Sequence, residues 1–238
     1  MISSLKELVK KYLRPFYMVY RYFSHDRQKK KENQNFKRNG LDVLKEFDRC
    51  LSENGFKYML AFGSALGAVR EKGFIPHDDD IDTWMWIDDY KPELISILEK
   101  YGFRYKFSFT IEDDKIGKQD TFEYKGVLVD IFYLYPSGSG EWPNCMIFCN
   151  YPDCSNRSES VKKHGGLLPL KCSLPISRNI KRVVFEDTMM PVPENYDEVM
   201  KERYGEDYMI PQPKWDKRNV NQNHVYLHDK VGLYKQYC

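Results

Sequence analysis

The sequence contains no apolar run long enough to cross a membrane and no internal repeat. A membrane-spanning helix needs roughly 18 apolar residues in succession, and no stretch of the chain approaches that length. Glycine is scarce, at 14 of 238 residues, which excludes a collagen-like chain. The N-terminus also lacks the apolar core and the small-residue cleavage site of a signal peptide. We therefore expect a protein that stays in the cytosol.

Aromatic residues, by contrast, are abundant. The chain has 14 Phe, 18 Tyr and 4 Trp, which offer enough surface for a buried core and exclude a largely disordered chain. With 42% hydrophobic and 30% charged residues, the composition is that of a globular protein. The length favours one domain, with at most an appendage.

The net charge of +2 conceals a strong asymmetry. Residues 1–40 carry 11 Lys and Arg against 3 Asp and Glu, a net charge of +8, whereas the rest of the chain carries −6. Apolar residues recur at helical spacing from Leu5 to Phe16, and Ser4 with Glu7 forms a capping-box pattern. Such a helix is typical of a segment on an anionic membrane, and equally of one that packs on the body or a second subunit. Because the basic excess is confined to one end, we expect no nucleic-acid partner.

Hydrophobic spacing predicts helices and strands along the rest of the chain. We expect helices over residues 39–52, 64–72, 91–100 and 195–203, and strands over 58–62, 80–86, 103–109 and 127–132. This order predicts a mixed sheet with helices packed on it, an α/β or α+β domain. Residues 136–178 are rich in Pro, Gly, Ser and Asn, and we expect them to form a loop.

Four of the six cysteines fall within that expected loop. These are Cys145, Cys149, Cys154 and Cys172, and His164 lies among them. Ligands of this kind can hold a structural Zn²⁺ ion, but the spacing lacks the two-residue knuckles that are typical of zinc sites. We therefore favour free, reduced thiols.

Aspartate is concentrated at positions 78, 79, 80 and 82. On a strand over 80–86, Asp80 and Asp82 project from one face while Ile81 points to the core. Two carboxylates so close repel each other unless a cation lies between them, and oxygen ligands of this type suit Mg²⁺ or Mn²⁺. The apolar residues on both sides of the cluster argue against a merely solvated acidic turn.

A further carboxylate, Asp130, interrupts the apolar run of residues 127–132. A lone carboxylate in a buried strand destabilises the folded protein by roughly several kcal/mol, unless it is paired with a cationic side chain or bound to a metal. An ion pair with Lys or Arg would relieve this cost. We favour a metal, because the two-carboxylate site needs a third ligand and such a triad binds one or two divalent ions for phosphoryl chemistry.

Residues 63–70 predict a turn from a strand into a helix. Gly63 permits the tight turn, and the backbone N–H groups of the helix start, with the Ser64 hydroxyl, can bind a phosphate. Arg70 lies two turns along the helix and offers a bidentate guanidinium. The pattern is weak by itself and gains weight because Gly63 stands 17 residues before Asp80.

The stretch from Phe62 to Asp82, FGSALGAVREKGFIPHDDDID, resembles the LicD-type phosphotransferases, whose relatives include fukutin and the fukutin-related protein. Residues 129–132 resemble the family's third-carboxylate strand. The FED of residues 185–187, the PVP of 191–193 and the YGEDYM of 204–209 resemble its C-terminal block. The resemblance spans residues 40–213.

This resemblance implies a nucleotidyltransferase-like fold. It also implies transfer of a phosphorylated alcohol, such as phosphocholine or a polyol phosphate, from a CDP-linked donor to a glycan hydroxyl. Gly63 and Ser64 would form the Gly-Ser turn of the fold. The metal triad, for Mg²⁺ or Mn²⁺, would be Asp80, Asp82 and Asp130.

Other residues near the motif are expected to contact substrate or phosphate: Arg70, His77 and Asp79. Asp130 is the best candidate for the general base, and His77 is the alternative because its ordinary pKa is near neutrality. His77 stands where many family members have Trp. A structural role for His77 beside the acidic turn is an equally good interpretation.

The expected organisation is a basic helix and linker over residues 1–38, the catalytic domain over 39–213 and a tail over 214–238. With a lipid-linked glycan acceptor, the protein would lie on the inner face of a membrane. A glycosyltransferase also uses an Asp-x-Asp pair, but it needs neither the Gly-Ser turn nor a later Asp. A non-catalytic, glycan-binding member would have lost a triad carboxylate, and all three are present.

Overall fold

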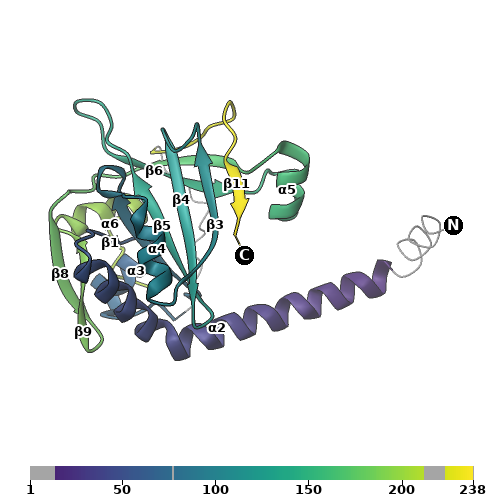
Figure 1. Cartoon of the computed structure of the whole chain (residues 1–238), viewed down its shortest axis with the longest axis horizontal. Coiled ribbons are helices and arrows are strands. Elements are labelled where there is room, and N and C mark those ends of the chain that lie inside the picture. The colour runs from purple at the N-terminus through teal and green to yellow at the C-terminus, as the bar shows by residue number, and fades with distance from the viewer. Residues whose placement is uncertain (1–13, 77, 212–222, 238) are drawn as a thin grey trace.

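The structure is a computed structural model that describes residues 14–76, 78–211 and 223–237, with side chains described from residue 34 onward. Within these ranges the chain forms three β-sheets with helices around them, and the long N-terminal helix extends away from the body (Figure 1). No described helix is long and apolar enough to span a membrane.

The largest sheet has six strands. Across the sheet they are β1 (Met59–Leu60), β2 (Asp80–Trp86), β5 (Val127–Leu134), β4 (Gly117–Tyr124), β3 (Arg104–Ile111) and β11 (Leu233–Gln236). The central strands β2 and β5 run parallel, and every other neighbouring pair is antiparallel. The mixed α/β architecture expected from the sequence is confirmed.

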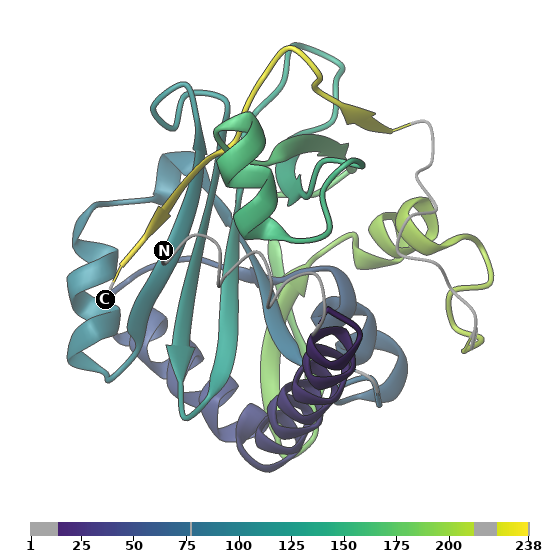
Figure 2. The same ribbon diagram turned by 90° about the vertical axis from the view of Figure 1, so that its right-hand side faces the viewer.

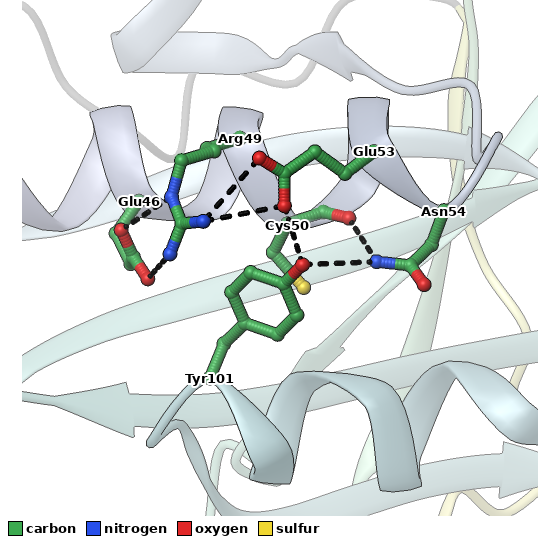
Figure 3. A network of polar contacts seen from close by, with 6 residues as sticks. All are labelled: Glu46, Arg49, Cys50, Glu53, Asn54 and Tyr101. Carbon is green, nitrogen blue, oxygen red and sulfur yellow. Dashed lines mark hydrogen bonds and ion pairs between the residues drawn. The ribbon is translucent and has the colours of Figure 1, made fainter.

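Helices α2 (Arg14–Glu53) and α4 (Glu93–Lys100) cover one face of this sheet (Figure 2). The part of α2 that lies on the sheet buries Leu44, Phe47 and Leu51 completely, and such burial is the main source of helix stability in a folded domain. The rim of this contact is polar. The Arg49 guanidinium bonds to the carboxylates of Glu46 and Glu53, and the Tyr101 hydroxyl, just after α4, donates to Glu53 at 2.5 Å (Figure 3).

Helix α2 corrects the expectation of a linker before residue 39. The helix runs without interruption from Arg14 to Glu53. Gly40, which reads as a helix breaker, is instead a point of close approach: a Cβ there would lie 3.3 Å from the Phe74 ring and 3.5 Å from the Phe36 ring. The tight contact explains why Gly is tolerated inside this helix despite its entropic cost. The expected amphipathic stripe from Leu5 lies largely outside the described residues.

The expectation of a loop over residues 136–178 is wrong. This segment contains β6 (Asn144–Cys149), α5 (Arg157–His164) and β7 (Leu168–Ser173), and β10 (His224–Tyr226) completes a three-stranded sheet in the order β10-β7-β6. The strands are short and carry no clear alternation. They are stabilised by pairing with each other and with β10, which is remote in sequence, and such pairing leaves little local signal.

The remaining elements follow the expected pattern more closely. α3 (Phe62–Leu66) continues into a π-helical turn, η1 (Gly67–Glu71), where we expected one helix over 64–72. A short 3₁₀ turn, η2 (Ile87–Asp89), follows β2. The hairpin of β8 (Ile180–Phe185) and β9 (Thr188–Pro193) was not expected. It precedes α6 (Tyr196–Tyr204), which matches the helix expected over residues 195–203.

Candidate active site

A cavity of about 1050 Å³ lies between the six-stranded sheet and the segment β6–α5–β7, with walls from both. The side chains of β5 alternate, so that Leu128, Asp130 and Phe132 line the cavity while Val129 and Ile131 are buried on the helix-covered side. The charged residues in the lining are Glu71, Asp78, Asp80, Asp82, Asp130, Arg70, Arg157 and Arg203.

The three carboxylates singled out in the sequence converge in this cavity. Asp82 on β2 lies directly opposite Asp130 on β5, and Asp80 projects from the same face two residues earlier. One oxygen of each carboxylate lies within 4.8 Å of the others. An arrangement of three carboxylate oxygens matches the ligand preference of Mg²⁺ and Mn²⁺.

Asp130 has the most perturbed electrostatics of the triad. The pKa of Asp130 is raised to about 7, mainly by burial and next by the negative charge of Asp80, against the opposing effects of a hydrogen bond from the Thr121 hydroxyl and the charge of Arg157. Thr121 lies opposite Asp130 in the β4–β5 pairing, and Thr83 on β2 donates to the Asp130 carbonyl at 2.8 Å. The carboxylate is therefore fixed in position but electrostatically uncompensated, which is the state that a bound cation relieves.

The Gly-Ser turn lies at the edge of the same cavity. Phe62 has a φ of +39°, a strained value for a bulky residue, and its ring packs edge-on against Trp84 and Phe132. Gly63 lines the cavity, where a Cβ would lie 3.1 Å from a carboxylate oxygen of Asp78. Ser64 is buried, and its hydroxyl accepts the backbone N–H of Asp82 at 3.0 Å. In this structure Ser64 thus anchors β2, and its predicted bond to phosphate stays a prediction.

The structure distributes the other predicted site residues differently. Arg70 lines the cavity, with Nε donating to Glu71 at 2.8 Å and Nη1 to the Tyr208 carbonyl at 3.2 Å. Asp79 is half-buried and is not part of the cavity lining. His77 lies outside the described residues, so its expected role as an alternative base stays a prediction.

The four clustered cysteines occupy separate places. Cys145 and Cys172 face each other across β6 and β7, and the Cys172 sulfur lies 3.0 Å from Nε2 of His224. Cys149 lines the cavity, and Cys154 lies with Asp153 and His164 in a group whose ligand atoms are within 4.8 Å of one another. Among the described residues these four sulfurs do not converge on one point, so a four-cysteine zinc site is not formed.

Sequence reasoning missed the residues that surround the triad. Gln119 and Thr121 come from β4, and Arg157 is the first residue of α5, inside the expected loop. A signal for α5 was available: Asn156 and Glu159 have the spacing of a capping box, and the Asn156 side chain accepts the Glu159 N–H at 3.0 Å. No local pattern marked β4 as the neighbour of β5.

Comparisons with known proteins agree with this geometry. The family described as LicD/FKTN/FKRP, nucleotidyltransferase domain, matches residues 55–195. Ribitol-5-phosphate transferase FKTN of Mus musculus is 26% identical over 193 residues, which cover 79% of this chain and 37% of the relative. FKTN of Homo sapiens is 26% identical over 200 residues, which cover 80% of this chain and 38% of the relative. Lipopolysaccharide cholinephosphotransferase LicD of Haemophilus influenzae is 43% identical over 51 residues, 21% of this chain and 19% of the relative. The matched part thus spans less than two fifths of the FKTN relatives.

Proposed function

Because this chain belongs to the LicD/FKTN/FKRP nucleotidyltransferase domain family, we propose that it transfers a phosphorylated alcohol from a CDP-linked donor to a glycan hydroxyl. The convergence of Asp80, Asp82 and Asp130 in one cavity is the observation that carries the proposal. The relatives named for ribitol-5-phosphate and choline-phosphate transfer differ in the alcohol but share the transferred class, a phosphorylated alcohol. A cavity of about 1050 Å³ is large enough for a nucleotide-linked donor and part of an acceptor.

The residues present fit a divalent cation. Three carboxylate oxygens within 4.8 Å of one another form a hard-ligand set, and burial together with the charge of Asp80 disfavours the ionised form of Asp130 and raises its pKa, an effect that a bound cation would oppose. Asp80, Asp82 and Asp130 would hold Mg²⁺ or Mn²⁺. Such an ion, when bound, neutralises charge on the donor phosphates and on the CMP leaving group.

The chain's own residues supply position and a proton acceptor. Ser64 and Thr83 fix β2 against the Gly-Ser turn and against β5, so the two strands present their carboxylates in one register. Thr121 orients Asp130 by a hydrogen bond to its carboxylate. Asp130 is placed to receive the proton of the acceptor hydroxyl as its oxygen attacks phosphorus in line with the leaving CMP oxygen. Positioning and fixed charge provide most of the rate in such reactions.

The same proposal extends to where the enzyme works. An acceptor glycan carried on a lipid would place the reaction at a membrane surface, and the +8 charge of residues 1–40 favours an anionic one. We place the protein on the inner face of such a membrane, attached peripherally.

The direct test offers CDP-choline, CDP-ethanolamine, CDP-glycerol and CDP-ribitol in turn, each with Mg²⁺, and measures CMP release. We expect release from one donor above the others and none in the presence of EDTA. UDP- and GDP-sugars run in parallel separate this activity from a glycosyltransferase. Release of nucleotide from a sugar donor alone would contradict the proposal, and so would failure of the chain to bind any CDP-alcohol.

A further inference from the structure

Arg157 lines the cavity but has no role in the transfer reaction as proposed above. It is the first residue of α5, and it lines the cavity from the wall opposite β2 and β5. Its guanidinium carbon lies 4.1 Å from the centre of the Phe107 ring, 5.4 Å from that of Phe109 and 5.5 Å from that of Tyr234. Cation–π contacts at these distances hold a guanidinium in place and leave its N–H donors available.

The three cavity arginines differ in their polar contacts. Arg70 donates to Glu71 and to the Tyr208 carbonyl, and Nη1 of Arg203 lies 3.1 Å from Nε2 of His224. Within the described part of the chain, Arg157 forms no ion pair with a carboxylate at 4.0 Å or less; its contacts are the three aromatic rings. A half-buried guanidinium without such a partner is a receptor for an anion, because its five donors match phosphate oxygens.

The backbone under Arg157 is fixed as well. The Asn156 side chain caps α5 by accepting the Glu159 N–H at 3.0 Å, and the Glu159 carboxylate accepts the N–H of Ser155 at 2.8 Å. The aromatic platform joins both walls, because the rings of Phe109 on β3 and Phe148 on β6 stack with centres 5.0 Å apart. Arg157 is therefore positioned before any ligand arrives, which lowers the entropic cost of binding.

We propose that Arg157 binds a phosphate group of the nucleotide-linked donor, opposite the carboxylate triad. The inference rests on the proposed function and adds to it a residue from α5, the helix between β6 and β7. Arg157 and Asp130 both line this one cavity, so both residues face the same space. A phosphate in that space is bound by the guanidinium on one side and by the cation site on the other.

This placement determines what Arg157 does in the reaction. The acceptor oxygen forms a bond to phosphorus, the bond from phosphorus to the CMP oxygen breaks, and the acceptor proton passes to the base. Negative charge then accumulates on the CMP phosphate. A guanidinium that contacts the donor phosphates stabilises the bound donor and also stabilises the negative charge that develops in the transition state. Its loss therefore weakens donor binding and slows transfer.

The experiment measures binding by calorimetry in the full chain with saturating Mg²⁺. The probes are CDP-choline, CDP-ribitol and inorganic pyrophosphate, each against wild type, Arg157→Gln and Arg157→Lys. We expect Arg157→Gln to raise the Kd of pyrophosphate and of the preferred CDP-alcohol about 10- to 100-fold, since a charge-assisted bidentate contact is lost. Arg157→Lys keeps the positive charge but loses the bidentate geometry of the guanidinium, so its Kd values should lie between those of wild type and Arg157→Gln.

Two further variants serve as comparisons. Arg104→Gln removes an exposed arginine that pairs with Glu123 at 2.5 Å and does not line the cavity, so its donor affinity should equal that of wild type. Phe107→Leu keeps an apolar side chain but removes the aromatic face under the guanidinium. We expect it to weaken pyrophosphate binding about threefold, less than Arg157→Gln does.

The outcomes separate this inference from the proposed function. Unchanged Kd values for pyrophosphate and CDP-alcohol in a folded Arg157→Gln would overturn the role of Arg157. So would a variant whose only defect is a raised KM for the acceptor. Pyrophosphate binding that depends on Arg157, without binding of any CDP-alcohol, supports the phosphate site and contradicts the CDP-alcohol function. Wild-type protein that binds neither probe overturns both.

Discussion

The two walls of the cavity are built in different ways. The carboxylate wall, made of β2 and β5, consists of two parallel, central strands whose register alone brings Asp82 opposite Asp130. The arginine wall, made of β6, α5 and β7, is a small sheet stabilised by β10 from near the C-terminus. The first wall carries Asp80, Asp82 and Asp130, and the second carries Arg157, whose guanidinium lies over the Phe107 ring of β3 in the six-stranded sheet.

The difference shows how one domain can divide chemistry from recognition. Each of these central strands is paired along both edges, β2 with β1 and β5, and β5 with β2 and β4, so a carboxylate on them is held rigidly. A peripheral sheet on short strands varies more easily between relatives, as connecting segments generally do. We therefore expect the alcohol and the glycan to be selected mainly on the arginine wall, and the phosphoryl step to depend on the carboxylate wall.

The largest expected effect tests the carboxylate wall. Asp80→Asn, Asp82→Asn and Asp130→Asn should each lower the rate of CMP release by about 1000-fold or more, because each removes an anionic ligand at the centre of charge. The matched control is Asp113→Asn, an exposed position with a φ of +53° that Asn adopts readily. An Asp130→Asn enzyme with near wild-type turnover would refute the assignment of that residue.

The second expected effect concerns stability. Asp130→Asn should lower the activity but stabilise the metal-free protein. In metal-free protein the pKa of Asp130 is about 7, above its unfolded value, so the folded state binds the proton more tightly. The resulting stability is complete below the unfolded pKa, near 4, and is lost as pH rises through 7. At pH 8, Asp130→Asn should therefore raise the free energy of unfolding by up to about 4 kcal/mol, with no gain at pH 4.

Urea unfolding with EDTA at both pH values measures this difference. Adding Mg²⁺ at pH 8 should stabilise the wild-type protein and leave Asp130→Asn nearly unchanged, since a ligand that binds only the folded state shifts the equilibrium toward it. A variant that is less stable than wild type at pH 8 without metal would show that Asp130 is compensated by its neighbours.

The third effect concerns the arginine wall and is smaller. Asn156→Ala removes the cap of α5 and should cost about 1 kcal/mol of local stability, measured as faster hydrogen exchange in α5. Donor affinity should fall about threefold, because Arg157 is less well positioned but its charge remains. Ser158→Ala, in the same first turn but exposed, is the control. Faster exchange with unchanged donor affinity would show that α5 does not position Arg157.

The smallest effect on catalysis should come from the N-terminus. A variant lacking residues 1–33 keeps Phe36 and the other α2 side chains that the structure describes as buried, so its turnover on a soluble acceptor should equal that of the full chain. Its binding to anionic liposomes at low salt should be lost, since each basic residue near such a surface contributes about 1 kcal/mol. Full-length protein that ignores anionic liposomes would favour packing of this helix on the body or on a second subunit.

What the sequence allowed one to predict follows the same division between the walls. The strand over residues 80–86, the fold class and the family resemblance are confirmed, because β2 carries a strong local pattern and the resemblance extends over the whole stretch from Phe62 to Asp82. The convergence of the triad followed from alternation on two apolar strands. Cys145 and Cys172, by contrast, read as loop residues, although they face each other in paired strands. Their environment depends on β10, and no local property of residues 144–173 encodes a partner near residue 224.

The two final strands have a consequence for synthesis of the chain. β10 pairs with β7 and β11 pairs with β3, so residues 224–236 join the three-stranded sheet to the six-stranded sheet, and the backbone of Gly232 bonds in both directions to Leu167. A nascent chain halted before residue 224 has already made both walls but lacks the segment that ties them. It presents the unpaired edges of β3 and β7, which invite association with other chains. A chain truncated before residue 224 should therefore be prone to aggregate.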